Sequence, residues 1–314
     1  MNGTESGMKR RAFLGGLAAA GAGGAIAGMP GHAEARESGM TGRRDICIFS
    51  KHLQFLDYAG AADAASAMGF DGLDIPVRPG GHVLPERAVD DLPRAVEAAR
   101  KKGLAVPMIT TAINGPDSPH AEDVLRTAAD LGVGYYRLGY YRYDDSLGIA
   151  GSLESQRSRL KELADMNRDI GIHGDYQNHS GIYVGSPIWD IWHLIRDLDP
   201  RWIGCQYDIR HATVEGGLCW PISMKLMAKF IKTTVAKDFR WEKADGSWKV
   251  INTHVGEGMV DFKAYFDLIR ELKISGPISM HFEYPHEPRR NVAEPLFTKD
   301  LRALRGFIKA AGLS

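Results

Sequence analysis

The C-terminal part of the chain carries a carboxylate and an imidazole where a short apolar run ends. The run Ile278–Glu283 predicts a strand, because a Gly-Pro pair precedes it and Pro285 follows it closely. Side chains alternate along a strand, so His281 and Glu283 share one face while Met280 lies on the other. In a barrel of parallel strands, catalytic side chains project from the carboxyl ends of the strands. Glu283 is therefore the first candidate for a catalytic base.

Polar side chains follow several other strand-like runs at the same point, where each run ends. The additional candidates are Arg78 and His82 after the second run, Gln177 and His179 at the end of the fifth, Asp208, Arg210 and His211 at the end of the sixth, and Lys237 at the end of the seventh. Buried charges must be paired or bound to metal, so such groups on successive strands predict one shared site.

The donor types in this set suit a divalent cation. Oxygen and imidazole ligands without thiolates favour Mn²⁺, which we expect first, with Mg²⁺, Co²⁺ or Zn²⁺ as alternatives. A carboxylate can remove the proton next to a carbonyl, and a bound cation stabilises the enediolate that results. This chemistry serves isomerisation and epimerisation, and also elimination and hydration of keto-sugars.

The elements that would position these residues alternate regularly between strand and helix. Strands are predicted over Asp45–Phe49, Gly72–Ile75, Val106–Thr111, Tyr135–Leu138, His173–Gln177, Ile203–Tyr207, Ile231–Lys237 and Ile278–Glu283. Helices are predicted over Leu56–Met68, Arg87–Lys102, Ala121–Leu131, Ser152–Ile170, Pro187–Leu198, Pro221–Lys229, Asp261–Leu272 and Lys299–Ala311. Eight such units predict a single (β/α)8 TIM barrel. An open doubly wound sheet is disfavoured, because no GxGxxG motif follows the first strand.

One insertion interrupts this alternation after the seventh strand. Residues 239–250 place an Asp245-Gly246 turn between aromatic-rich flanks, which predicts a β-hairpin. The hairpin would project over the C-terminal face, either as a lid that brings Trp241 to a substrate or as a structural or oligomer-contact element.

The N-terminal residues read as an export signal and not as part of the fold. Arg10-Arg11 precedes Phe13 and Leu14, as in twin-arginine signals, and the following Ala/Gly-rich run is too weakly apolar for a stable membrane anchor. We expect a signal peptide over residues 1–35, cleaved near Ala35, then a linker over 36–44 and the barrel over 45–314. The expected location is the periplasm.

The chain resembles the sugar phosphate isomerase/epimerase family, also called xylose isomerase-like TIM barrels. The resemblance rests on residues 67–74, 177–179, 208–211, 237–238, 256–262 and 282–283. It implies one divalent metal held by a Glu, an Asp, a His and a second Glu from strands five to eight. Asp208 and Glu283 match two of these ligands, whereas Gln177 replaces the first Glu and Val235 stands at the position of the His.

The resemblance implies roles for Gln177, Asp208, His211 and Glu283, and positions at strand ends or in the hairpin give roles to the other candidates. We expect Glu283, Lys237 and His211 to be catalytic, with Gln177, Asp208, Glu283 and His281 as metal ligands and Arg78, His82, His179, Arg210 and Trp241 as substrate contacts. Gln177 cannot be a base, so a reaction with two carboxylate bases is disfavoured. Lys237 could also replace the charge of a metal near an enolate, and its other interpretation is a local ion pair with Asp238.

The expected function is therefore that of a periplasmic, metal-dependent sugar isomerase or epimerase acting on a free sugar or keto-sugar. The alternatives are a lyase or hydratase on 3-keto-glycosides that uses one base, or a sugar-binding protein without catalysis. Lysine and arginine balance aspartate and glutamate at 39 each, so nucleic acid is not an expected partner. A homo-oligomer is left open.

Overall fold

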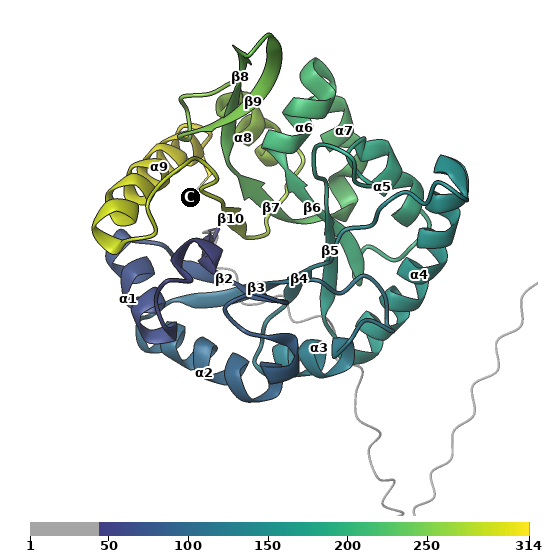
Figure 1. The fold of residues 1–314 in the computed structure, drawn as a ribbon, viewed down its shortest axis with the longest axis horizontal. Coiled ribbons are helices and arrows are strands. Elements are labelled where there is room, and N and C mark those ends of the chain that lie inside the picture. The colour runs from purple at the N-terminus through teal and green to yellow at the C-terminus, as the bar shows by residue number, and fades with distance from the viewer. Residues whose placement is uncertain (1–43, 314) are drawn as a thin grey trace, which may run out of the picture. The chain divides into compact units, whose positions relative to one another are not determined.

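Eight parallel strands close into a barrel inside a ring of helices, within the residues that the computed structural model describes, 44–313 (Figure 1). The barrel strands are β1 (Ile46–Phe49), β2 (Gly72–Val77), β3 (Ala105–Thr111), β4 (Tyr135–Arg137), β5 (His173–Gln177), β6 (Ile203–Asp208), β7 (Ile231–Ala236) and β10 (Ile278–Met280). β10 pairs with β7 on one side and with β1 on the other, which closes the barrel. The predicted TIM barrel is confirmed. The predicted signal peptide lies outside the described residues.

The helices cover the outside of the barrel. They are α1 (Tyr58–Met68), α2 (Ala88–Lys101), α3 (Ala121–Asp130), α4 (Gly148–Ile170), α5 (Ile188–Ile195), α6 (Ile209–Gly216), α7 (Trp220–Met227), α8 (Phe262–Glu271) and α9 (Arg290–Ala310). Gly69 and Gly171 end α1 and α4 in the left-handed conformation that glycine adopts at little cost. None of the helices described here is long and apolar enough to cross a membrane.

The helix predictions missed one helix and misplaced the start of another. The helix predicted over Pro221–Lys229 is present as α7, but α6 precedes it and begins at Ile209, because the Asp208 side chain accepts a hydrogen bond from the His211 amide and caps it. The last helix was expected to begin at Lys299, but α9 begins at Arg290 and contains Pro295.

The eighth barrel strand ends earlier than predicted. β10 stops at Met280, because the Phe282 amide donates to Nε2 of His52 and takes no part in the sheet. Phe282 stacks on Phe297 of α9 with the ring centroids 4.0 Å apart. Glu283 therefore lies in the loop after β10.

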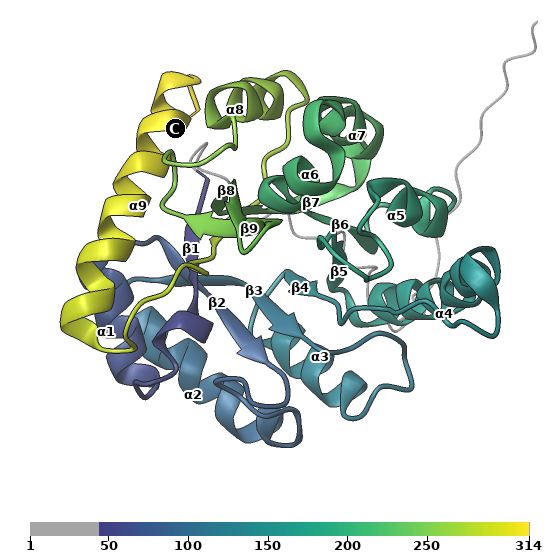
Figure 2. The same cartoon turned by 45° about the horizontal axis from the view of Figure 1, so that its top comes forward.

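The predicted hairpin is present after the seventh barrel strand as β8 (Asp238–Ala244) and β9 (Ser247–Thr253), and both views show it between α6 and α8 (Figures 1 and 2). Asp245 and Gly246 both have positive φ, at 51° and 75°, as a two-residue hairpin turn requires. The carboxylate of Asp238 accepts hydrogen bonds from four backbone amides, those of Phe239, Gly256, Gly258 and Val260. Asp238 thus holds the base of the hairpin and does not pair with Lys237.

The barrel interior contains a buried carboxylate, Asp74 of β2, which accepts hydrogen bonds from Thr110 and Ser279. Burial raises the pKa of Asp74 to about 6, although both hydroxyl groups act in the opposite direction. Because the folded-state pKa exceeds the unfolded value, the contribution of Asp74 to stability is greatest below the unfolded pKa and is lost as the pH rises through about 6.

We expect Asp74→Asn to flatten this pH dependence. The amide avoids the cost of a buried charge, so the variant should gain up to about 3 kcal/mol relative to wild type between pH 4 and pH 8. Urea unfolding at both pH values measures the difference. A free energy of unfolding that changes with pH equally in both proteins would contradict the expectation.

Candidate active site

A buried lysine lies between the two candidate carboxylates at the C-terminal ends of β6, β7 and β10. Nζ of Lys237 is 3.2 Å from Oδ2 of Asp208, 3.5 Å from Oε1 of Glu283 and 2.8 Å from Nε2 of His211. Lys237 is 3% exposed and Asp208 is fully buried. We call Lys237, Asp208, Glu283, His211 and Gln177 the Lys237 cluster. The cluster unites all three predicted catalytic residues.

Backbone hydrogen bonding explains why Asp208 holds its position. The side chain of Asn178 donates to the Asp208 carbonyl and accepts from the Asp208 amide, which joins the loop after β5 to the end of β6. Asp208 also caps α6, and this places His211 one turn into the helix beside the same carboxylate. The Asp208 carboxylate is therefore held in place and is buried from solvent.

Gln177 faces this carboxylate through its amide nitrogen, not its oxygen. Nε2 donates to Oδ2 of Asp208 at 2.8 Å. Oε1 accepts from Arg137 at 3.0 Å and from the Tyr140 hydroxyl at 2.6 Å. The sequence-based prediction did not include Arg137 or Tyr140. Arg137 is the last residue of β4, so the same rule applied to the fourth strand could have found it.

Glu283 is the carboxylate of the cluster that substrate can reach, because 27% of its side chain is exposed. Its Oε1 also lies 3.8 Å from Nζ of Lys51 and 3.9 Å from Nδ1 of His281. The Lys237 ammonium is the main cause that lowers the pKa of Glu283 to about 2, with smaller effects from Lys51 and Arg210. Glu283 is thus a carboxylate at any physiological pH, the form that a base requires.

His211 is neutral, because burial and then the charge of Lys237 place its pKa well below the ordinary value. Nε2 of His211 lies 2.8 Å from Nζ of Lys237, and Nδ1 lies 2.8 Å from Oγ of Ser180 and 2.9 Å from Nη1 of Arg210. Arg210 donates to the same hydroxyl. The ring of His179 lies 4.0 Å from that of His211, so this predicted substrate contact lies beside the cluster.

The hairpin reaches the site through Asn252 of β9. Its side chain accepts from Nη2 of Arg210 at 2.7 Å and donates to the Glu283 carbonyl at 3.2 Å. Trp241 lies on the opposite strand of the hairpin and is 39% exposed, and its ring packs near Phe239. The structure records no contact between Trp241 and the Lys237 cluster among the described residues, so its substrate role stays a prediction.

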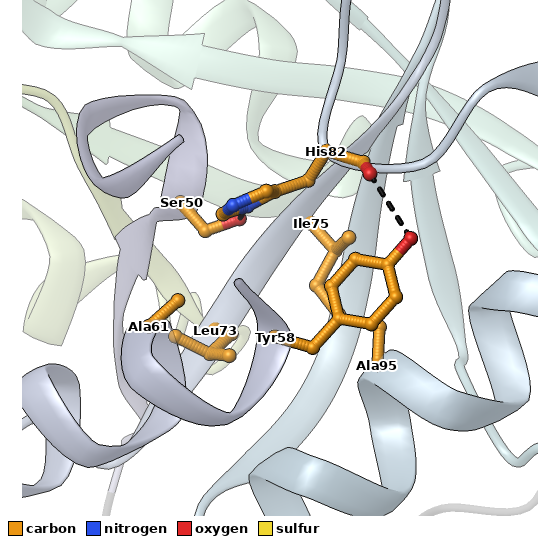
Figure 3. Close-up of a pocket in the computed structure, with 7 residues that line it drawn as sticks. All are labelled: Ser50, Tyr58, Ala61, Leu73, Ile75, His82 and Ala95. Atoms are coloured by element: carbon orange, nitrogen blue, oxygen red, sulfur yellow. Dashed lines mark hydrogen bonds between the residues drawn. The ribbon is translucent and has the colours of Figure 1, made fainter. Parts of the chain in front are cut away.

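His82 lies in a different environment, at a cavity of about 10 Å³ beside β2 (Figure 3). Its ring nitrogens contact Oγ of Ser50 and the Leu56 carbonyl, and its own carbonyl accepts from the Tyr58 hydroxyl. A space of this size holds about one water molecule. His82 can bind a sugar only by giving up one of these hydrogen bonds, and the structure thus favours a structural role.

The predicted metal ligands do not fit a divalent cation in this arrangement. The Lys237 ammonium already lies between Asp208 and Glu283, and the oxygen of Gln177 is held by Arg137 and Tyr140. The remaining predicted ligand, His281, contacts Ser279 through Nε2. Within residues 44–313, no group of three or more His, Cys, Asp or Glu side chains is placed to hold a metal ion. Two cationic side chains, Lys237 and Arg137, thus contact the groups that were expected to bind the metal.

Comparison with known proteins places this geometry in context. A family model described as xylose isomerase-like TIM barrel matches residues 62–307. No curated protein sequence matches the chain.

Solved structures with the same fold are numerous and distant in sequence. A 3-keto-D-glucoside 4-epimerase from E. coli shares 14% identity, with 84% of this chain and all of the other covered at a TM-score of 0.64. A probable 3-DHS dehydratase from Bacillus anthracis shares 11% identity, with 83% and 98% covered at 0.64. A xylose isomerase-like protein from Mycobacterium smegmatis in complex with magnesium shares 15%, with 85% and 97% covered at 0.65. Identities this low show the fold alone.

Proposed function

The chain belongs to the xylose isomerase-like TIM barrel family, and from this premise we propose that it is an enzyme that removes a proton next to the carbonyl of a free sugar or keto-sugar. The observation that carries the proposal is the pairing of a reachable carboxylate, Glu283, with the Lys237 ammonium 3.5 Å away. An ionised base beside a cation is what formation of an enolate requires.

The steps follow from the side chains present. Glu283 accepts the proton from the α-carbon, and negative charge develops on the carbonyl oxygen. The Lys237 ammonium stabilises this charge, because its low exposure keeps water from screening it. His211 accepts a hydrogen bond from Lys237 and orients the ammonium, and Ser180 holds the other side of the imidazole.

The charge that a divalent cation would supply is, in this proposal, supplied by Lys237. Similar structures are described as a 3-keto-D-glucoside 4-epimerase and as a probable 3-DHS dehydratase, which supports weighing both kinds of chemistry. The single reachable carboxylate favours reactions with one base, either an isomerisation in which Glu283 returns the proton or an elimination or hydration on a 3-keto-glycoside. Isomerase or epimerase remains the first assignment, and a lyase or hydratase the second.

Solvent exchange tests the proposal and separates these reactions. The purified protein is incubated in D₂O with D-fructose, D-tagatose and methyl 3-keto-β-D-glucoside, and NMR follows the proton next to the carbonyl. Exchange with retention of methanol indicates isomerase chemistry, and release of methanol indicates a lyase. Binding of these sugars without exchange or elimination would show the third alternative, a sugar-binding protein without catalysis.

Metal removal should leave the protein unchanged. We expect dialysis against EDTA to alter neither the melting temperature nor the rate of solvent exchange, since Lys237 provides the positive charge between the carboxylates. Elemental analysis of the protein before dialysis is the independent readout. About one equivalent of tightly held Mn²⁺, Mg²⁺, Co²⁺ or Zn²⁺, lost together with activity, would contradict the expectation and restore the original metal assignment.

We also propose that the protein is exported to the periplasm, on the basis of Arg10-Arg11 and the run that follows. Fractionation of cells that express the full chain tests this, with Arg10→Lys/Arg11→Lys as the variant that should stay in the cytoplasm. Homo-oligomerisation stays a prediction that light scattering can decide.

A further inference from the structure

The arginines around the Lys237 cluster have no carboxylate partners. Within the described residues, Arg78, Arg137 and Arg210 form no ion pair, whereas many exposed arginines do, for example Arg87 with Asp90 and Asp91. Arg137 and Arg210 are 4% and 7% exposed, and Nε of each is buried without a hydrogen-bond partner. Buried cations are normally paired, so this arrangement indicates an anion that the protein itself does not supply.

Two of the cations lie within 6 Å of the centroid of one aromatic ring, Phe49 at the end of β1. Cζ of Arg78 is 5.4 Å from the centroid of the Phe49 ring, and Nζ of Lys51 is 5.9 Å from it. The structure gives the Arg78 guanidinium no hydrogen bond to any described residue. Burial lowers the pKa of Arg78, and the charge of Arg137 lowers it further, which shows that these cations repel one another.

The nearby histidine side chains are uncharged, and their lowered pKa values reflect the same surrounding positive charge. His52, His179, His211 and His281 all have pKa values below the ordinary range, first through burial and then through Lys51 or Lys237. The carboxylates near the cations Lys51, Arg78, Arg137, Arg210 and Lys237 are Asp74, Asp208 and Glu283, and the exposed Glu215 acts on Arg210. The mouth of the barrel therefore carries a local excess of positive charge, although the whole chain is neutral.

We propose that the substrate carries an anionic substituent, a carboxylate or a phosphate, which Arg78 and Lys51 bind beside Phe49. The inference rests on the proposed function and adds the substrate class, an acidic sugar. Arg78 is the main determinant, because its planar fork can donate two parallel hydrogen bonds to such a group. Lys51 contributes charge and is released from Glu283 as the anion binds, which leaves Glu283 paired with Lys237.

Calorimetric titration at low ionic strength tests the proposal without any need for turnover. The ligands are D-glucuronate, D-glucose 6-phosphate and D-glucose, which share a ring and differ in the anionic group. We expect one of the anionic sugars to bind about tenfold more tightly than glucose, or better, with the difference reduced by salt. The affinities for D-glucuronate and D-glucose 6-phosphate show whether the site prefers a carboxylate or a phosphate.

Three variants make the result specific. Arg78→Met should lower the affinity for the anionic sugar about tenfold more than the affinity for glucose, which removes the preference. Lys51→Met, a change at a side chain that is 40% exposed, should reduce the preference. Arg87→Met, which removes a surface arginine, is the matched control and should bind as wild type. Equal affinity of wild type for all three ligands, absence of binding by both anions, or equal loss of glucose and anion binding in Arg78→Met would each overturn the proposal. Anion preference without exchange of the proton next to the carbonyl, in either the neutral sugars or the bound anionic sugar, would instead refute the proposed function alone.

Discussion

Glu283→Gln is expected to lower kcat for solvent exchange by about 10³-fold, within the usual contribution of a general base. The amide keeps the shape of the carboxylate but cannot accept the α-proton. Lys237 retains Asp208 as a partner at 3.2 Å, so the fold should remain intact. Single-turnover NMR exchange rates and a circular dichroism melt are the measurements, and substrate affinity should change much less than kcat.

The matched control for this change is Glu271→Gln, on α8. Glu271 is a surface carboxylate that pairs with Lys225 at 3.8 Å, and its loss should leave exchange as in wild type. A Glu283→Gln variant that retains kcat within about tenfold of wild type would show that another group is the base.

Lys237→Met is expected to impair both stability and chemistry. The lysine is almost fully buried between carboxylates, so its loss leaves Asp208 without a counter-charge and should cost about 3–5 kcal/mol in the free energy of unfolding. Loss of the ammonium beside the developing enolate should also lower kcat by about 10²–10³-fold. Urea unfolding measures the first effect and solvent exchange the second.

The pH profile distinguishes an electrostatic role of Lys237 from a structural one. In wild type the pKa of Glu283 is about 2, so the base is ionised throughout the range in which the protein is folded. Without Lys237, the main cause of this low pKa is gone, and the acid limb of kcat/KM should move up towards the ordinary glutamate range. Lys237→Arg retains the charge and should keep the acid limb low. An acid limb unchanged in Lys237→Met would mean that the ion pair does not control the base.

Several parts of the fold could be predicted from sequence because local patterns determine them. The apolar runs of the barrel strands, the glycines that end α1 and α4, and the Asp245-Gly246 turn each depend on residues close together in the chain. Glu283, Asp208, Lys237 and His211 could be selected as one site, because the ends of parallel strands converge whatever their spacing in sequence.

The sequence did not determine which side chains these residues contact. Contacts between strands depend on the register of the strands and on where each side chain points. Lys237 was equally compatible with a pair to its neighbour Asp238, yet four backbone amides hold Asp238 and Lys237 lies between Asp208 and Glu283. The amide of Gln177 was expected to bind a metal but contacts Arg137.

The sequence alone thus determined the barrel, the hairpin and the candidate base, since these follow from periodicity and from the position of Glu283 just after a strand. The tertiary structure decided what charge stands beside that base. Only the closed barrel brings the lysine that follows β7 between carboxylates from β6 and the loop after β10, and burial strengthens the electrostatic interactions of that lysine because water screens them less.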